Sequence, residues 1–240
     1  WCIGVNNLAS GIDILIPSFC GERYLPLCLI ALSQSSYKNF KIYISVDGSL
    51  KNHNYITGLI EYLDLQVTIS ISNNRLGLAG NRLRLLEMGE SNHILWLDDD
   101  VLVSENSLEH LVKHLGGLGK KFPIITGVGS NIMSYPKVAC GLGLTLIDRN
   151  QLCNDPALNH EFGFNTGEDW LWTARIVYKT GLPISFVPVS IFHLGEYRKR
   201  KRYSRQWNSS MFSIYTSEAF FMENKEELEL SFPIYNYMDY

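Results

Sequence analysis

The sequence predicts an α/β protein with a mostly parallel central sheet that is flanked by helices. Of its 240 residues, 46% are hydrophobic and 19% are charged, which is typical of a globular domain with a sizeable core. Short apolar runs, which suit strands buried on both faces, alternate with longer segments of helical spacing. This alternation is typical of a parallel sheet that helices cover on both sides.

The first half of the chain alternates regularly between strand and helix. The opening apolar run ends at Pro17, and Leu25, Leu29 and Leu32 give the next segment one apolar side. We expect strands at residues 12–16, 41–46, 66–70, 94–97 and 122–126. We expect the helices between them at residues 21–32, 55–63, 77–88 and 104–115.

The second half is less regular. Residues 138–147 are apolar with glycines and predict one or two strands that cross the sheet differently. Residues 154–167 are expected to form a loop. A helix is expected over 167–179, and Gly181 just beyond it is a typical helix stop signal. A last core strand is expected at 184–187.

Polar or turn residues follow three of the expected strands. They occupy positions 17–19, 47–49 and 98–100. The carboxyl ends of parallel strands lie at one edge of the sheet, and ligands of such sheets bind beyond that edge. The sequence therefore predicts a binding site where these three segments meet.

The apolar run at 94–97 continues directly into three carboxylates, Asp98, Asp99 and Asp100. Because side chains alternate along a strand, Asp98 and Asp100 are expected to point the same way and Asp99 to point away. Such oxygen ligands suit Mg²⁺ or Mn²⁺, and a site with few protein ligands leaves room for phosphates. The alternative is an acidic strand end that precedes a helix N-terminus near Ser104.

Two later segments carry further candidate site residues. Asp169 is a candidate general base that takes a proton from an acceptor hydroxyl. The preceding Glu168 has a structural explanation, since acids at a helix N-terminus interact favourably with the helix dipole. His193 is a candidate third metal ligand if its strand end lies near the aspartates, and a structural histidine otherwise.

Charge and cysteine content narrow the class of protein. The formal charge of −3 does not favour a nucleic-acid partner. A basic run from Arg198 to Arg205, with aromatic residues between the charges, is either a solvated surface or a flap that meets phosphates. The five cysteines contain no C-x-x-C pair, so we expect reduced thiols and a cytoplasmic setting. No apolar run is long enough to span a membrane.

The order and spacing of these motifs resemble family 2 glycosyltransferases, which have a GT-A type fold with a Rossmann-like sheet. The resemblance covers roughly residues 12 to 195 and includes the D-x-D signature at Asp98 and Asp100. The other matching positions are Pro17, Phe19, Glu22, Asp47, Gly77 to Asn81, Gly141 to Arg149, Glu168, Asp169 and His193.

Two positions depart from the family pattern. Val46 stands where the family has the first Asp of an Asp-Asp-Gly-Ser motif, so Asp47 is the acid that remains. Gly80 stands where the family has an arginine, and Arg82 instead follows Asn81.

The resemblance implies inverting sugar transfer, as in polysaccharide biosynthesis, from a nucleotide-sugar donor to a hydroxyl of a glycan or glycoconjugate. A UDP-sugar is the favoured donor. Mn²⁺ or Mg²⁺ would be held by Asp100, Asp98 and His193, with Asp169 as the base. Donor-binding residues would be Pro17, Phe19, Glu22, Asp47, Asn81, Arg82, Asp98 and Asp99. Acceptor-binding residues would be Glu168 and Trp170, with Trp172 as either a second aromatic wall or a core residue.

The resemblance also implies how the chain is divided. We expect a single domain over 1–240, with a nucleotide-sugar-binding half at about 12–130 and a smaller acceptor and catalytic subregion at 131–195. The tail at 196–240 is basic and aromatic, which allows peripheral association with the inner face of a membrane or homo-oligomer contact. A catalytically inactive homologue that binds nucleotide sugars is the alternative. A nucleotidyltransferase is less favoured because residues 17–22 lack a Gly- and Arg-rich phosphate loop.

Overall fold

The computed structural model describes residues 11–19, 23–48, 50, 53–74, 76–118, 123–128, 142–151 and 168–194. Its strands are β1 (Ile12–Phe19), β2 (Phe40–Asp47), β3 (Val67–Ser72), β4 (His93–Leu97), β5 (Val101–Val103), β6 (Ile124–Val128), β7 (Leu144–Asp148), β8 (Ser185–Pro188) and β9 (Ile191–His193). Its helices are α1 (Leu25–Ser33), α2 (His53–Tyr62), α3 (Gly77–Met88), α4 (Ser107–Leu118) and α5 (Glu168–Thr180), and a 3₁₀ turn follows β7 at Arg149–Gln151.

The main sheet has seven strands in the order β3-β2-β1-β4-β7-β6-β8. β1 pairs in parallel with both β2 and β4, β2 pairs in parallel with β3, and β6 pairs in parallel with β8. Among the described strands of this sheet, only β7 runs against its neighbours, β4 and β6. The predicted mostly parallel sheet is therefore confirmed, and β7 is the strand expected to cross it differently.

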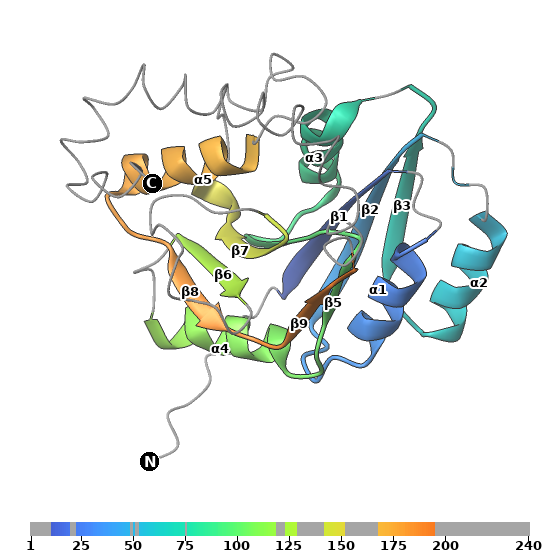
Figure 1. Cartoon of the computed structure of the whole chain (residues 1–240), viewed down its shortest axis with the longest axis horizontal. Coiled ribbons are helices and arrows are strands. Elements are labelled where there is room, and N and C mark those ends of the chain that lie inside the picture. Colours follow the sequence, from blue (N-terminus) through green and yellow to red (C-terminus); the bar gives the residue numbers. More distant parts are fainter. Residues whose placement is uncertain are drawn as a thin grey trace, which may run out of the picture.

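Side-chain alternation along the strands gives the sheet two apolar faces. On one face, residues such as Ile14 and Leu97 pack against α1, α2 and α4. On the other face, residues such as Leu15 and Trp96 pack against α3 and α5. Figure 1 shows the result, with α3 and α5 above the sheet and α1 and α4 below it. Helices on both faces bury the centre of the sheet, which explains why the central strands β1 and β4 are largely apolar and buried.

Trp96 of β4 contacts Trp172 of α5 within the second of these layers. The two fully buried rings have centroids 5.5 Å apart and planes tilted by 55°. Core packing is thus the role of Trp172. The contact also fixes the start of α5 against β4, because Glu168 and Asp169 occupy the first turn of that helix. In Figure 1 the other end of α5 leads into β8, so its N-terminal end points toward α3.

The observed elements differ from the predicted ones mainly at short strands and helix starts. β1 continues past Pro17, which stays in register with Ser45 of β2. α4 begins at Ser107, three residues later than expected, and the preceding segment contains β5, which was not predicted. β5 pairs antiparallel with β9, so a second, two-stranded sheet stands beside the main one. Three-residue strands carry too short a pattern to be recognised from sequence.

Several sequence predictions lie outside the described residues. These are the strand expected before position 142, the loop at 154–167, Glu22, and the tail after residue 194. Within the described residues, no helix combines the length and the apolar character needed to cross a bilayer.

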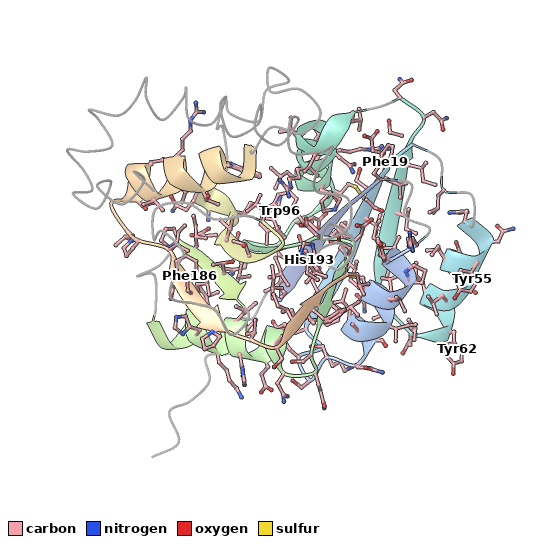
Figure 2. The ribbon with its side chains drawn as sticks, viewed as in Figure 1. Phe19, Tyr55, Tyr62, Trp96, Phe186 and His193 are labelled. Atoms are coloured by element: carbon pink, nitrogen blue, oxygen red, sulfur yellow. The ribbon has the colours of Figure 1, made fainter. Side chains whose placement is uncertain are left out.

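Replacing Trp172 with Ala should lower the free energy of unfolding by about 3–5 kcal/mol, because it removes a fully buried indole from the α5 layer. Urea unfolding followed by circular dichroism measures the change. The control is Tyr62→Ala, since Tyr62 of α2 is 85% exposed (Figure 2) and its loss should cost about 0.5 kcal/mol or less. Equal effects in the two variants would contradict the assigned packing.

Candidate functional site

The three predicted carboxylates form a turn, here called the acidic turn (Asp98–Asp100), between β4 and β5. β4 ends at Leu97, and the Val101 N–H donates a hydrogen bond to the Asp98 carbonyl at 3.1 Å. The Asp98 N–H donates to the Gly143 carbonyl at 3.1 Å, which ties the turn to the chain just before β7. The carboxylates are thus oriented by a turn, although the prediction assumed strand alternation.

Asp98, Asp100 and His193 come together at this turn. Each offers one ligand atom, and these atoms lie within 4.8 Å of one another. His193 Nε2 is 2.9 Å from Asp100 Oδ1, although 93 positions separate the two residues. The second sheet explains the approach, because β5 and β9 pair with Val101 opposite His193 and the Leu194 N–H donates to the Asp100 carbonyl. Figure 2 labels His193 near the middle of the molecule.

The donor set of this group fits a divalent cation. Carboxylate oxygens suit Mg²⁺ and Mn²⁺, and an imidazole nitrogen is a common additional ligand. The side chains are 34% exposed at Asp98, 21% at Asp100 and 30% at His193. Three partly exposed ligands leave room for water or for phosphate oxygens in the remaining coordination positions.

Asp99 is not part of this ligand group, and its carboxylate has a partner of its own. Its carboxylate accepts a hydrogen bond from the hydroxyl of Ser18, a buried residue near the end of β1. The pKa of Asp99 is raised to about 7, mainly by burial; the Ser18 hydrogen bond lowers it, and the neighbouring carboxylates of Asp100 and Asp98 contribute to the rise. Ser18 belongs to the 17–19 segment that was expected to meet the 98–100 segment, although no separate role was predicted for this residue.

Arg82 approaches the acidic turn from α3, which belongs to the layer that α3 and α5 form on one face of the sheet. Its side chain is only 2% exposed, and its Nη2 lies 3.5 Å from Asp98 Oδ1. Its guanidinium carbon lies 5.9 Å from the ring centroid of Trp96, within the range of a cation–π contact. These contacts are with the protein interior. The predicted contact of Arg82 with the donor stays a prediction.

Asp47 and Asn81 join α3 to the ends of β1 and β2. The Asp47 carboxylate accepts hydrogen bonds from the Leu76 and Gly77 N–H groups, at 2.8 and 2.9 Å, where α3 begins. Asn81 Nδ2 donates to the Ser18 carbonyl at 3.2 Å and to the Ser45 carbonyl at 2.9 Å. Both side chains are buried. Their observed contacts are structural, and their predicted contacts with a donor stay predictions.

Of the remaining predicted site residues, some are described with their side chains and others only by their backbone. Pro17 is buried and Phe19 is exposed, both at the end of β1 that reaches the acidic turn. The backbones of Glu168, Asp169 and Trp170 form the first turn of α5, and their side chains lie outside what the structure describes.

Arg149, which the family resemblance associates with the acceptor side, lies at the opposite edge of the sheet. Its Nη2 is 3.3 Å from Asp13 Oδ2 at the start of β1, and its Nε donates to the Ser91 carbonyl just before β4. The Asp13 carboxylate also accepts hydrogen bonds from the Glu90 and Ser91 N–H groups. Arg149 therefore holds the starts of β1 and β4 together and does not contribute to the acidic turn.

Comparison with known families gives a match over most of the described core. A family model described as "Glycosyl transferase family 2" matches residues 13–169. The matched segment begins in β1, contains the acidic turn and ends in the first turn of α5.

A curated relative and several solved structures are also similar to this chain. Glycosyltransferase GlyG of Streptococcus pneumoniae serotype 4 is 25% identical over 104 residues, which are 43% of this chain and 35% of GlyG. The chain thus matches about a third of the length of that relative.

Two solved structures share the fold at low sequence identity. The S. aureus TarS 1–349 structure in complex with UDP has a TM-score of 0.59 at 15% identity, covering 75% of this chain and 61% of that one. The mannosyltransferase PcManGT from Pyrobaculum calidifontis, in complex with GDP-Man and Mn²⁺, also has a TM-score of 0.59 at 15% identity. That match covers 74% of this chain and 54% of PcManGT. The expected GT-A type fold is confirmed.

Replacing Asp47 with Ala should destabilise the protein by about 1–2 kcal/mol, because it removes the cap from two N–H groups at the start of α3. Asp47→Asn keeps one acceptor oxygen and should have an intermediate stability. Urea unfolding of the two variants and the unchanged protein measures this order. An Ala variant as stable as the unchanged protein would show that the cap contributes nothing.

Proposed function

Because the chain belongs to glycosyltransferase family 2, we propose that it moves a sugar from a nucleotide-sugar donor to a hydroxyl acceptor with inversion. The carrying observation is that Asp98, Asp100 and His193 meet at the carboxyl edge of parallel strands. Open α/β sheets bind their ligands beyond this edge. The similarity to TarS with UDP and to PcManGT with GDP-Man and Mn²⁺ supports a nucleotide-sugar donor and a divalent cation.

Asp98, Asp100 and His193 are the residues proposed to hold Mn²⁺ or Mg²⁺. The ion, when bound, neutralises charge that develops on the leaving diphosphate, a Lewis-acid effect of several kcal/mol. The exposed ring of Phe19, at the same sheet edge, offers a surface on which the donor base stacks. The buried Asp47 and Asn81 support the donor side by fixing α3 against β1 and β2.

Asp169 is the proposed general base. The acceptor oxygen attacks the anomeric carbon while Asp169 takes its proton, and the bond to the diphosphate oxygen breaks on the opposite face. This role needs the first turn of α5 to stay fixed relative to the acidic turn. The contact of Trp172 with Trp96 supports that requirement, because Trp96 lies two residues before Asp98 on β4. Glu168 and Trp170, in the same turn of α5, are proposed to contact the acceptor.

Replacing Asp169 with Asn should lower turnover by about 10²–10⁴-fold, because the amide cannot accept the acceptor proton. Release of nucleoside diphosphate from a panel of UDP- and GDP-sugars measures turnover, and calorimetry with the nucleoside diphosphate measures donor-side binding, which should be unchanged. Glu61→Gln, on the exposed side of α2, is the matched control. Unchanged turnover in the Asp169 variant would remove the base assignment.

Removing the divalent cation should weaken binding of UDP or GDP by about tenfold or more, which corresponds to about 1.4 kcal/mol. Isothermal titration with Mn²⁺, and the same titration with EDTA, measures the difference. In an Asp100→Asn variant the two titrations should agree, because the cation site has lost a carboxylate. Equal affinities with Mn²⁺ and EDTA in the unchanged protein would refute the metal part of this proposal.

A further inference from the structure

The carboxylate of Asp98 lies between a guanidinium on one side and the backbone of a glycine on the other. Arg82 Nη2 of α3 lies 3.5 Å from Asp98 Oδ1. On the other side, a Cβ atom added at Gly143 would lie 3.2 Å from Asp98 Oδ2. The main chain of Gly143 also accepts the hydrogen bond from the Asp98 N–H. The orientation of this carboxylate therefore depends on the residues around it as well as on its own backbone.

Arg82 is itself held firmly. It is 2% exposed, and a guanidinium keeps its charge at any ordinary pH. Burying that charge is unfavourable unless an anion is nearby, and the Asp98 carboxylate supplies one. The guanidinium also lies over the ring of Trp96, which packs in turn on Trp172. Arg82 thus connects the acidic turn to the aromatic contact between β4 and α5.

We propose that Arg82 is a positioning residue of the cation site, which holds the Asp98 carboxylate in reach of Asp100 and His193. The inference rests on the proposed function, since it takes Asp98 to be a cation ligand. It assigns Arg82 a role other than contact with donor phosphates. Outer-shell partners that orient metal ligands typically change metal affinity by about 10–100-fold when they are replaced.

The charge of Arg82 and its geometry have opposite effects on cation affinity. A positive charge near the site repels a divalent cation, so removal of the charge alone would tighten cation binding. Loss of orientation at Asp98 would weaken cation binding. Arg82→Lys separates the two effects, because lysine keeps the charge but lacks the planar guanidinium.

The first experiment titrates Mn²⁺ into the protein and follows free Mn²⁺ by electron paramagnetic resonance. Arg82→Lys should raise the Kd for Mn²⁺ by about tenfold or more. Arg84→Lys is the matched control, because Arg84 lies on the exposed side of α3, where it donates to the Ile71 carbonyl, and its Kd should stay within about twofold of the unchanged protein. An unchanged Kd in Arg82→Lys would overturn the inference, because it would show that the planar guanidinium is not needed to hold Asp98 in place.

A second variant disturbs the same carboxylate without altering any charge. Gly143→Ala places a methyl group against Asp98 Oδ2, so the carboxylate must shift by a few tenths of an ångström. It should also weaken Mn²⁺ binding. Gly58→Ala on α2 is the control, because nothing lies within 4 Å of the added Cβ. If Arg82→Lys loses cooperative thermal unfolding in EDTA, the Gly143 variant still tests the premise that the orientation of the Asp98 carboxylate governs Mn²⁺ affinity, and an unchanged Kd there would overturn the inference.

A third measurement separates positioning from donor contact. UDP binding is titrated in EDTA, where Arg82→Lys should leave the affinity unchanged if the residue acts through Asp98. A weaker metal-free affinity would overturn the inference, because it would indicate direct contact with the donor. If the unchanged protein binds no Mn²⁺, the metal part of the proposed function fails. If it binds Mn²⁺ and both variants keep its affinity, only the present inference fails.

Discussion

The repulsion among three consecutive carboxylates is the constraint around which the site is built. Two unit charges 4 Å apart repel by about 4 kcal/mol in an environment of intermediate polarity, so three acids in one turn need compensation. Each acid obtains a different partner. Asp99 meets the Ser18 hydroxyl from β1, Asp98 meets Arg82 from α3, and Asp100 meets His193 from β9. The raised pKa of Asp99 reduces the total charge further at neutral pH. Three distant elements of the chain thus supply the partners that compensate the charge of the acidic turn.

The position of Arg82 depends on the residues that attach α3 to the sheet. Asp47 caps the start of the helix, and Asn81 bonds to carbonyl groups of both β1 and β2. Arg82 is the next residue, so these bonds determine where its guanidinium can reach. Asp47 and Asn81 match family motifs that suggest donor contact, yet in this chain their observed contacts support the residue that faces Asp98. Outer parts of a site can thus govern the geometry of its ligands without contacting a ligand themselves.

The features that could be predicted from sequence are those with a long or strongly periodic pattern. The helix at 77–88 was predicted with its observed ends, and the parallel order of the first strands followed from their regular alternation with helices. β5 and β9 were missed because each has three residues and gains its stability from pairing with the other. Asp98 and Asp100 do converge, but a turn and the β5–β9 pairing bring them together. The Arg149–Asp13 ion pair also depends on tertiary contacts that no local pattern contains.

An arginine beside a cation ligand has a disadvantage and an advantage. It repels the incoming ion, and so lowers the affinity that three ligands of the same geometry would otherwise have. Without it, however, the Asp98 carboxylate would lie beside the Asp100 carboxylate without the compensating charge of Arg82, and the repulsion between the two acids would tend to move Asp98 away from Asp100 and His193. Reassembling the ligands on binding would then cost free energy that a preorganised site has already expended during folding. The burial of Arg82 between Trp96 and Asp98 favours the preorganised arrangement, since the aromatic contact keeps the guanidinium in place whether or not an ion is bound.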